Sequence, residues 1–203
     1  MNFQHIARRV THKQVIMSTF CALPSITCAY AKTERIAIFT ASGETLHPMR
    51  QLLWDECGVD PEDKRFVIVG CQDVPGFETV AQGKRVDVDE CMVGNIVQRA
   101  KDVVAKHAKT DSPIRAIVFE CTELPPYSDA VRAATKLPVF DAITTCNSFV
   151  NSTRNNARFG VADAEWHVSW DRKHDDYRFG KFLSIAMKEK LVNDDDKRVH
   201  VSM

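Results

Sequence analysis

The sequence has little of what marks several large classes of protein. Its 203 residues carry 27 basic and 27 acidic side chains, so the formal net charge is zero. A nucleic-acid binder needs a surplus of Lys and Arg to neutralise phosphates, and this balance argues against one. No apolar run approaches the roughly 20 residues that cross a bilayer, so we expect no membrane span. Eight glycines and eight prolines are too few for a low-complexity chain.

Metal and nucleotide motifs are also missing. The seven cysteines are widely and irregularly spaced: Cys21, Cys28, Cys57, Cys71, Cys91, Cys121 and Cys146. There is no CxxC pair and no Cys/His cluster with zinc-ligand spacing, and an odd count does not suggest a disulfide framework. No Walker phosphate loop and no G-x-G-x-x-G motif follows a strand, so nucleotide binding is not expected. These absences predict a reduced, cytoplasmic protein with no structural metal and no bound nucleotide.

The first 33 residues contain no Asp or Glu. Arg8, Arg9 and Lys13 precede an apolar stretch over 15–31, which is also the pattern of a targeting peptide. Polar residues and Pro24 interrupt that stretch and weaken its hydrophobicity. Two interpretations therefore stay open for this segment, a targeting peptide and a part of the folded protein.

From residue 35 onward, short apolar runs alternate with amphipathic stretches. The apolar runs predict buried parallel strands at 36–40, 66–70, 116–119 and 138–141. The amphipathic stretches predict helices at about 44–57, 89–107 and 126–136, and a loop or broken turn is expected over 71–83. This order predicts an α/β fold, a doubly wound and parallel four-stranded sheet with flanking helices.

Chemistry in such a sheet is expected at the carboxyl ends of the strands. Cys121 directly follows the third predicted strand and precedes a proline-started helix, where backbone N–H groups and the helix dipole favour a thiolate. We therefore expect a lowered pKa for Cys121, although the neighbouring Glu123 opposes that shift. The same N–H groups, with the Thr122 hydroxyl, can hold a carboxylate. A buried core thiol is the alternative for Cys121, and for Cys71 it is the favoured interpretation.

The residues around Cys121 also carry a family resemblance. Residues 119–127 are Phe-Glu-Cys-Thr-Glu-Leu-Pro-Pro-Tyr, and residues 137–141 are Leu-Pro-Val-Phe-Asp. They resemble the second catalytic segment of the aspartate/glutamate racemase superfamily, which includes aspartate, glutamate and hydantoin racemases, maleate isomerase and arylmalonate decarboxylase. Residues 36–46 resemble the opening of the family's second domain, and 15–19 resemble the last strand of its first domain.

The resemblance implies an isomerase or racemase of amino-acid metabolism that works without a cofactor. Such an enzyme moves a proton at a carbon next to a carboxylate, with a thiol as the base. Cys121 would be that base, and Glu123 its acidic partner; the alternative for Glu123 is a first-turn acid that interacts with the helix dipole. The residues that the resemblance implies for binding a small carboxylate or amino acid are Thr122, Ser18 and Thr19. Thr40 is a further candidate because it lies at the end of a predicted strand.

The chain departs from the family in its first lobe. The family places its first catalytic cysteine upstream of the segment that matches 15–19, and the residues that precede this segment here contain no cysteine. We expect a first-lobe remnant over 1–33, an α/β lobe over 34–153, and a C-terminal extension and tail over 154–203. A remnant lobe predicts exposed apolar surface and a homo-oligomer. Three hypotheses stay open: a racemase or isomerase, a single-cysteine decarboxylase-like lyase, and a non-catalytic degenerate member.

Overall fold

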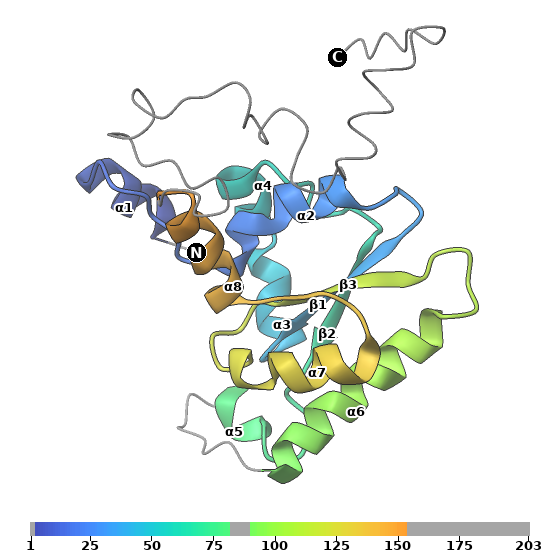
Figure 1. The fold of residues 1–203 in the computed structure, drawn as a ribbon. Coiled ribbons are helices and arrows are strands. Elements are labelled where there is room, and N and C mark those ends of the chain that lie inside the picture. Colours follow the sequence, from blue (N-terminus) through green and yellow to red (C-terminus); the bar gives the residue numbers. More distant parts are fainter. Residues whose placement is uncertain (1–2, 82–89, 154–203) are drawn as a thin grey trace, which may run out of the picture. The chain divides into compact units, whose positions relative to one another are not determined.

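The computed structural model describes residues 3–81 and 90–153. Four strands form one sheet in these residues: β1 (Arg35–Thr40), β2 (Phe66–Gly70), β3 (Ile114–Phe119) and β4 (Val139–Phe140). Their order is β2-β1-β3-β4, and every pairing is parallel (Figure 1). The predicted α/β class and the parallel four-stranded sheet with flanking helices are therefore confirmed.

Helices and short 3-10 helices connect these strands. The elements before the sheet are α1 (Gln4–Val10), the 3-10 helix η1 (Thr19–Ala22) and α2 (Leu23–Ala29). Those between β1 and β2 are α3 (Gly43–Leu46), η2 (His47–Met49) and α4 (Gln51–Cys57). Those between β2 and β3 are α5 (Glu78–Ala81) and α6 (Glu90–His107). The remainder are η3 (Pro125–Tyr127), α7 (Ser128–Thr135) and, after β4, α8 (Ala142–Asn151).

The central strand β1 supplies side chains to two cores, one on each face of the sheet. Ala37 and Phe39 belong to the core that includes residues of α6 and α7. Ile36 and Ile38 belong to the core that includes residues of η1, α2, α3 and α4. All four side chains are fully buried, and burial on both faces is why β1 appears in the sequence as a continuous apolar run. Figure 1 shows α6 and α7 together on one side of the strands.

The helices differ from the prediction in their continuity. The predicted helix over 44–57 is divided into three pieces, because Pro48 lies in the 3-10 helix η2 and lacks the N–H that a continuous α-helix needs. Helix α6 is observed from Glu90, and residue 89 lies outside the described residues. Three helices were not predicted at all, and the first of them is α1. Within 71–83 the structure has the short α5, and after β4 it has the ten-residue α8.

Residues 15–19 do not form the strand that the resemblance implied. The Gln4 side chain uses the backbone groups of this segment: its Nε2 donates to the Val15 carbonyl at 2.7 Å, and its Oε1 accepts from the Met17 N–H at 3.0 Å. Ser18 then caps η1, since its Oγ accepts from the Phe20 N–H at 3.2 Å. These local bonds replace the ladder that a sheet strand would form, so the predicted strand is wrong.

Apolar side chains are exposed around this N-terminal segment, as the sequence predicts. Phe3, Ile6 and Val10 are 65%, 48% and 79% exposed and lie at spacings that share one face of α1. The homo-oligomer that we expected to cover such surface stays a prediction. The predicted division at residue 33 also stays a prediction, and the predicted C-terminal extension over 154–203 lies outside the described residues.

None of the helices within the described residues has both the length and the apolar character that crossing a bilayer requires.

Candidate functional site

Hydrogen bonds join the carboxyl ends of β1, β2 and β3. The Thr40 hydroxyl donates to Glu120 Oε2 at 2.9 Å, and the Glu120 N–H donates to the Phe39 carbonyl at 2.8 Å. The Cys71 N–H donates to the Thr40 carbonyl at 2.9 Å. The polar side chains that follow the three strands are therefore held at one edge of the sheet. This is the edge where parallel sheets place their ligands.

Glu120 is the residue of this edge that sequence reasoning missed. Its side chain is partly buried, and burial raises the pKa of its carboxyl group, while the hydrogen bond from Thr40 acts in the opposite direction. The family resemblance instead implies Glu123, two residues beyond Cys121, as the acidic partner of the thiol. A signal for Glu120 was present, since it directly precedes Cys121 and follows the buried strand β3. A carboxyl group that directly follows a buried strand lies at the boundary between the core and the solvent.

Cys121 is partly buried and accepts hydrogen bonds from the backbone N–H groups of Glu123 and Ala41. These donors favour a thiolate, but burial raises the pKa of the thiol, and the charges of Glu120 and Glu123 raise it further. The net shift is upward, so the predicted lowering is wrong. The helix dipole contributes little, because the chain continues from Cys121 into the short η3 and α7 begins only at Ser128.

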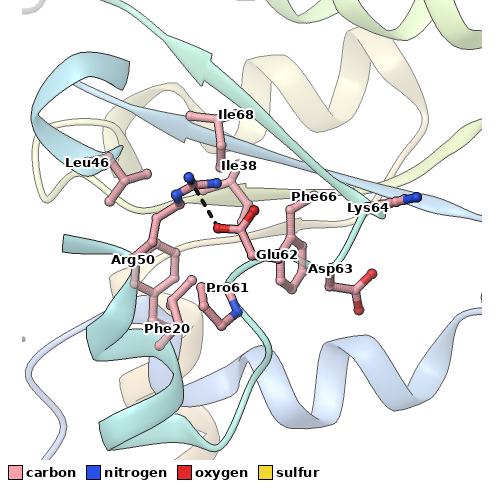
Figure 2. Close-up of a pocket in the computed structure, with 11 residues that line it drawn as sticks. Phe20, Ile38, Leu46, Arg50, Pro61, Glu62, Asp63, Lys64, Phe66 and Ile68 are labelled. Carbon is pink, nitrogen blue, oxygen red and sulfur yellow. Dashed lines mark ion pairs between the residues drawn. The ribbon is translucent and has the colours of Figure 1, made fainter. Parts of the chain in front are cut away.

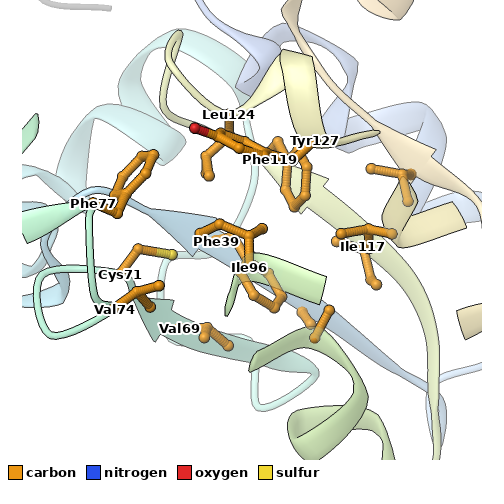
Figure 3. Packing of buried hydrophobic residues seen from close by; sticks show 14 of the residues in the cluster. Phe39, Val69, Cys71, Val74, Phe77, Ile96, Ile117, Phe119, Leu124 and Tyr127 are labelled. Atoms are coloured by element: carbon orange, nitrogen blue, oxygen red, sulfur yellow. The ribbon is translucent and has the colours of Figure 1, made fainter. Parts of the chain in front are cut away.

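Cys71 lies close enough to Cys121 for the two thiols to influence each other, but it is fully buried. Figure 3 shows it among the side chains of Val69, Val74 and Phe77. Burial raises the pKa of Cys71 to about 12, and the Cys121 and Asp73 charges act in the same direction. Cys71 is thus a core thiol at neutral pH, which leaves Cys121 as the accessible sulfur at this edge.

The other predicted site residues differ in their burial and in whether they contact Cys121 or Glu120. Thr40 is buried and in contact with Glu120, whereas Thr122 and Glu123 are exposed beside Cys121. The Ser18 hydroxyl is engaged in capping η1. Thr19 is 1% exposed, and its Oγ1 has no hydrogen-bond partner among the described residues. The structure therefore brings Thr40, Glu120 and Cys121 together, whereas Ser18 and Thr19 form no hydrogen bond with these three residues within the described ranges.

The carboxyl end of β4 is fixed by Asp141. Its carboxylate accepts from the Ser128 hydroxyl at 2.5 Å and from the Thr144 N–H at 2.7 Å. The Thr144 hydroxyl in turn accepts from the Asp141 N–H at 2.8 Å, which is a reciprocal cap at the start of α8. Asp141 is 3% exposed and fully used in these bonds, so it supports the edge of the sheet. Across residues 3–81 and 90–153, no three His, Cys, Asp or Glu side chains gather as a metal site would require.

A separate pocket of about 210 Å³ opens beside β2 and α4. Figure 2 shows Arg50 and Glu62 facing each other across it, and their ion pair measures 3.3 Å. Cys121 and Glu120 are not among its lining residues. Its volume is below the 300–1,000 Å³ or so of ordinary small-molecule sites, and none of the cysteines in the described residues lines it.

The fold and the sheet edge together describe an α/β protein with a thiol and a carboxyl group at its strand ends. The chain is 65% identical over 193 residues to dimethylsulfoniopropionate lyase 7 of Emiliania huxleyi (strain CCMP1516), covering 95% of this chain and 56% of that protein. It is 62% identical to dimethylsulfoniopropionate lyase 3 of the same strain, covering 95% of this chain and 50% of that protein. It is also 45% identical to the dimethylsulfoniopropionate lyase of Durusdinium sp. clade D, covering 95% of this chain and 61% of that protein.

The chain thus spans about half the length of the curated relatives it matches. No family model matches the chain. No solved structure matches it either.

These comparisons overturn the assignment to the aspartate/glutamate racemase superfamily. Relatives at 45–65% identity over 193 residues are named as lyases, and no family model supports a racemase. The isomerase and racemase interpretations are therefore wrong. The resemblance rested mainly on the short segment 119–127, whose residues place a thiol between a buried strand and a proline-started turn. Such a segment determines where a thiol lies, whereas the reaction depends on the rest of the site.

Proposed function

We propose that this chain is a lyase that cleaves dimethylsulfoniopropionate by β-elimination. The observation that carries the proposal is the 65% identity over 193 residues to a protein named for that activity. Of the three hypotheses drawn from the sequence, the lyase is thereby favoured, with an elimination from a sulfonium substrate in place of a decarboxylation. The substrate carries a carboxylate at one end and a dimethylsulfonium cation at the other. Breaking its carbon–sulfur bond by elimination yields dimethyl sulfide and acrylate.

In the proposed reaction Cys121 acts as the general base. Its thiolate removes a proton from the carbon next to the carboxylate, and the electron pair of that C–H bond forms the carbon–carbon double bond. The bond between the β-carbon and sulfur breaks, and its electrons leave with the neutral dimethyl sulfide. Cys121 is then a thiol, and it returns its proton to solvent before the next cycle.

The charges around Cys121 suit a cationic substrate. Burial and two nearby carboxylates raise the pKa of Cys121, so the thiolate is scarce before substrate binds, but it is a stronger base once formed. A bound sulfonium cation favours the thiolate and the ionised form of Glu120, because opposite charges stabilise each other in a partly buried site. Thr40 holds the Glu120 carboxyl group in place at 2.9 Å. Backbone N–H groups and the exposed Thr122 hydroxyl would bind the substrate carboxylate.

The proposal is tested by measuring dimethyl sulfide released from dimethylsulfoniopropionate, by headspace gas chromatography. We expect Cys121→Ser to lower the rate by about a thousandfold, within the range that a general base contributes. Cys146→Ser is the matched control, because Cys146 is exposed on α8, and we expect it to keep the parent rate.

Because the chain spans about half of its relatives, the assay has a second arm. The same release is measured for the 65% identical Emiliania huxleyi relative, and for this chain mixed with the part of that relative that it does not match. An active relative beside a chain that releases nothing in either setting would overturn the proposed function. Release that survives Cys121→Ser would overturn the role of the thiol and leave the substrate assignment standing.

A further inference from the structure

Cys21 and Cys57 form a second pair of sulfurs, away from the sheet edge. Cys21 lies in η1, and Cys57 is the last residue of α4. Their side chains are hydrogen-bonded to each other, and both are partly buried. They are 36 positions apart in the sequence, and nothing in the spacing of the cysteines suggests that they meet.

The two elements that carry the pair are fixed independently. The Ser18 hydroxyl caps η1, and Gln4 binds the segment that leads into it. Helix α4 ends where Gly58 adopts a left-handed conformation with φ 65°, and the Gly58 N–H donates to the carbonyls of Leu53 and Trp54. The elements η1 and α4 pack against each other in the core that contains Phe20 and Leu53. The fold therefore holds the two elements that carry Cys21 and Cys57 next to each other.

We propose that Cys21 and Cys57 form a thiol–disulfide exchange site, which reacts with a small disulfide and closes into an intramolecular Cys21–Cys57 disulfide. This site is independent of the proposed lyase activity. Partial burial admits a small reagent to the sulfurs and disfavours a bulky protein partner. The sulfurs already lie within hydrogen-bond reach, and closing the disulfide requires a side-chain rotation that brings them to the roughly 2 Å of an S–S bond.

The exchange proceeds in two balanced steps. The Cys21 thiolate attacks one sulfur of the small disulfide, forms a mixed disulfide, and expels one thiolate. Cys57 then loses its proton to solvent and attacks the Cys21 sulfur, which expels the second thiolate. Two protein thiols are oxidised to one disulfide, and the small disulfide is reduced to two thiols.

The electrostatics of the pair favour this order. The hydrogen bond from Cys57 is the main reason that the pKa of Cys21 is lowered to about 6. The pKa of Cys57 is raised, chiefly because its proton is shared with the Cys21 sulfur and also because it is buried. Once Cys21 is in the mixed disulfide, its negative charge is gone, and the main obstacle to ionising Cys57 goes with it. Glu56 then opposes ionisation and Arg8 favours it, and these two form an ion pair of 2.6 Å.

The other cysteines lack this combination. Cys28, Cys91 and Cys146 are exposed, Cys71 is buried with its pKa raised to about 12, and Cys121 has a raised pKa. A small disulfide should therefore react at Cys21 before it reacts elsewhere.

The test treats the reduced 203-residue chain with oxidised glutathione, blocks remaining thiols in acid, and maps the peptides by mass spectrometry. We expect a Cys21–Cys57 crosslink that dithiothreitol reverses. Cys57→Ala should instead accumulate one glutathione on Cys21, because the second step is lost. Cys28→Ala is the matched control and should form the crosslink as the parent does. Circular dichroism checks that each variant is folded.

Two outcomes would overturn the proposal. One is a crosslink that joins a different pair in the folded parent protein. The other is a Cys57→Ala variant that takes up glutathione at Cys28 or Cys146 in preference to Cys21. A variant that fails to fold leaves the decision to the crosslink map of the parent, which needs no substitution.

Discussion

Cys121 and Cys21 are both partly buried thiols, but their pKa values are shifted in opposite directions. Both receive backbone hydrogen bonds, but Cys21 lies within the 3-10 helix η1 whereas Cys121 precedes the 3-10 helix η3. Yet the pKa of Cys121 is raised, by burial and by two nearby carboxylates. The pKa of Cys21 is lowered to about 6, by the thiol of Cys57 and by backbone bonds from Met17 and Ser18. Burial acts in the same direction on both sulfurs. The neighbours therefore decide the sign, and neutral donors without a nearby carboxylate are the more effective stabilisers of a thiolate.

The comparison predicts a large difference in reactivity with pH. A thiol with a pKa of about 6 is roughly nine-tenths ionised at pH 7, and one above the ordinary 8.5 is ionised to about 3% or less. The thiolate fraction at Cys21 should thus exceed that at Cys121 by more than about thirtyfold. The rate of iodoacetamide labelling should level off above pH 7 for Cys21 and keep rising above pH 8 for Cys121, as read by peptide mass spectrometry. Parallel profiles for the two residues would refute the contrast.

Removing the Cys57 thiol, which donates a hydrogen bond to Cys21, should abolish the high thiolate fraction of Cys21 at neutral pH. In Cys57→Ala the main cause of the low pKa is absent, and burial, which raises the pKa of Cys21, is then opposed by the smaller contributions of the backbone bonds from Met17 and Ser18. The labelling midpoint should move from about pH 6 towards or above the ordinary 8.5, which reduces the thiolate fraction at pH 7 by up to about thirtyfold. Cys28→Ala should leave the midpoint unchanged. A midpoint that stays near 6 in Cys57→Ala would mean that the backbone bonds alone set it.

Neutralising the Glu120 carboxyl group should make the labelling rate of Cys121 more like that of Cys21. Glu120→Gln removes a charge that raises the pKa of Cys121 while keeping the shape and a partner for Thr40. Labelling of Cys121 at pH 7 should become about two- to fivefold faster. Glu123→Gln is the matched control, with a smaller gain expected because Glu123 is exposed and its charge is better screened. A larger gain in Glu123→Gln would reverse our ranking of the two acids.

The smallest effect is expected from the cap of η1. Ser18→Ala removes the hydroxyl that accepts the Phe20 N–H, which should lower the free energy of unfolding by about 1 kcal/mol. The labelling rate of Cys21 should change by less than about twofold, because Gln4 still holds the preceding segment. Urea titration and labelling of the same samples check both values. A large change in labelling would show that the cap, and not Cys57, maintains the environment of Cys21.

The sequence was informative where one element carries its own pattern. The strand β1 is apolar on both faces, and α6 repeats its apolar positions over several turns, so both could be predicted. Helix α8 was not predicted, because the sequence pattern extends the fourth strand to Asp141, whereas the Asp141 side chain caps the helix that follows. The strand over 15–19 was wrong because the competing donor and acceptor, Gln4, lies in a different element.

The candidate site was predictable in position but not in electrostatics. A thiol after a buried strand points to the sheet edge, and Cys121 does lie there. The sign of its pKa shift depends on the depth of burial and on the distance to Glu120, which no linear pattern contains. The Cys21–Cys57 pair is even harder to predict from the sequence, because the two thiols meet only after η1 and α4 have packed.

The bonds of Asp141 have a consequence for how this edge of the sheet opens. One carboxylate accepts from the first residue of α7 and from the first turn of α8, while its own residue directly follows β4. Neither helix start can therefore fray without releasing a bond of the other. Amide hydrogens in the first turns of α7 and α8 should exchange with deuterium as a single cooperative unit, even though a strand separates the two helices along the chain.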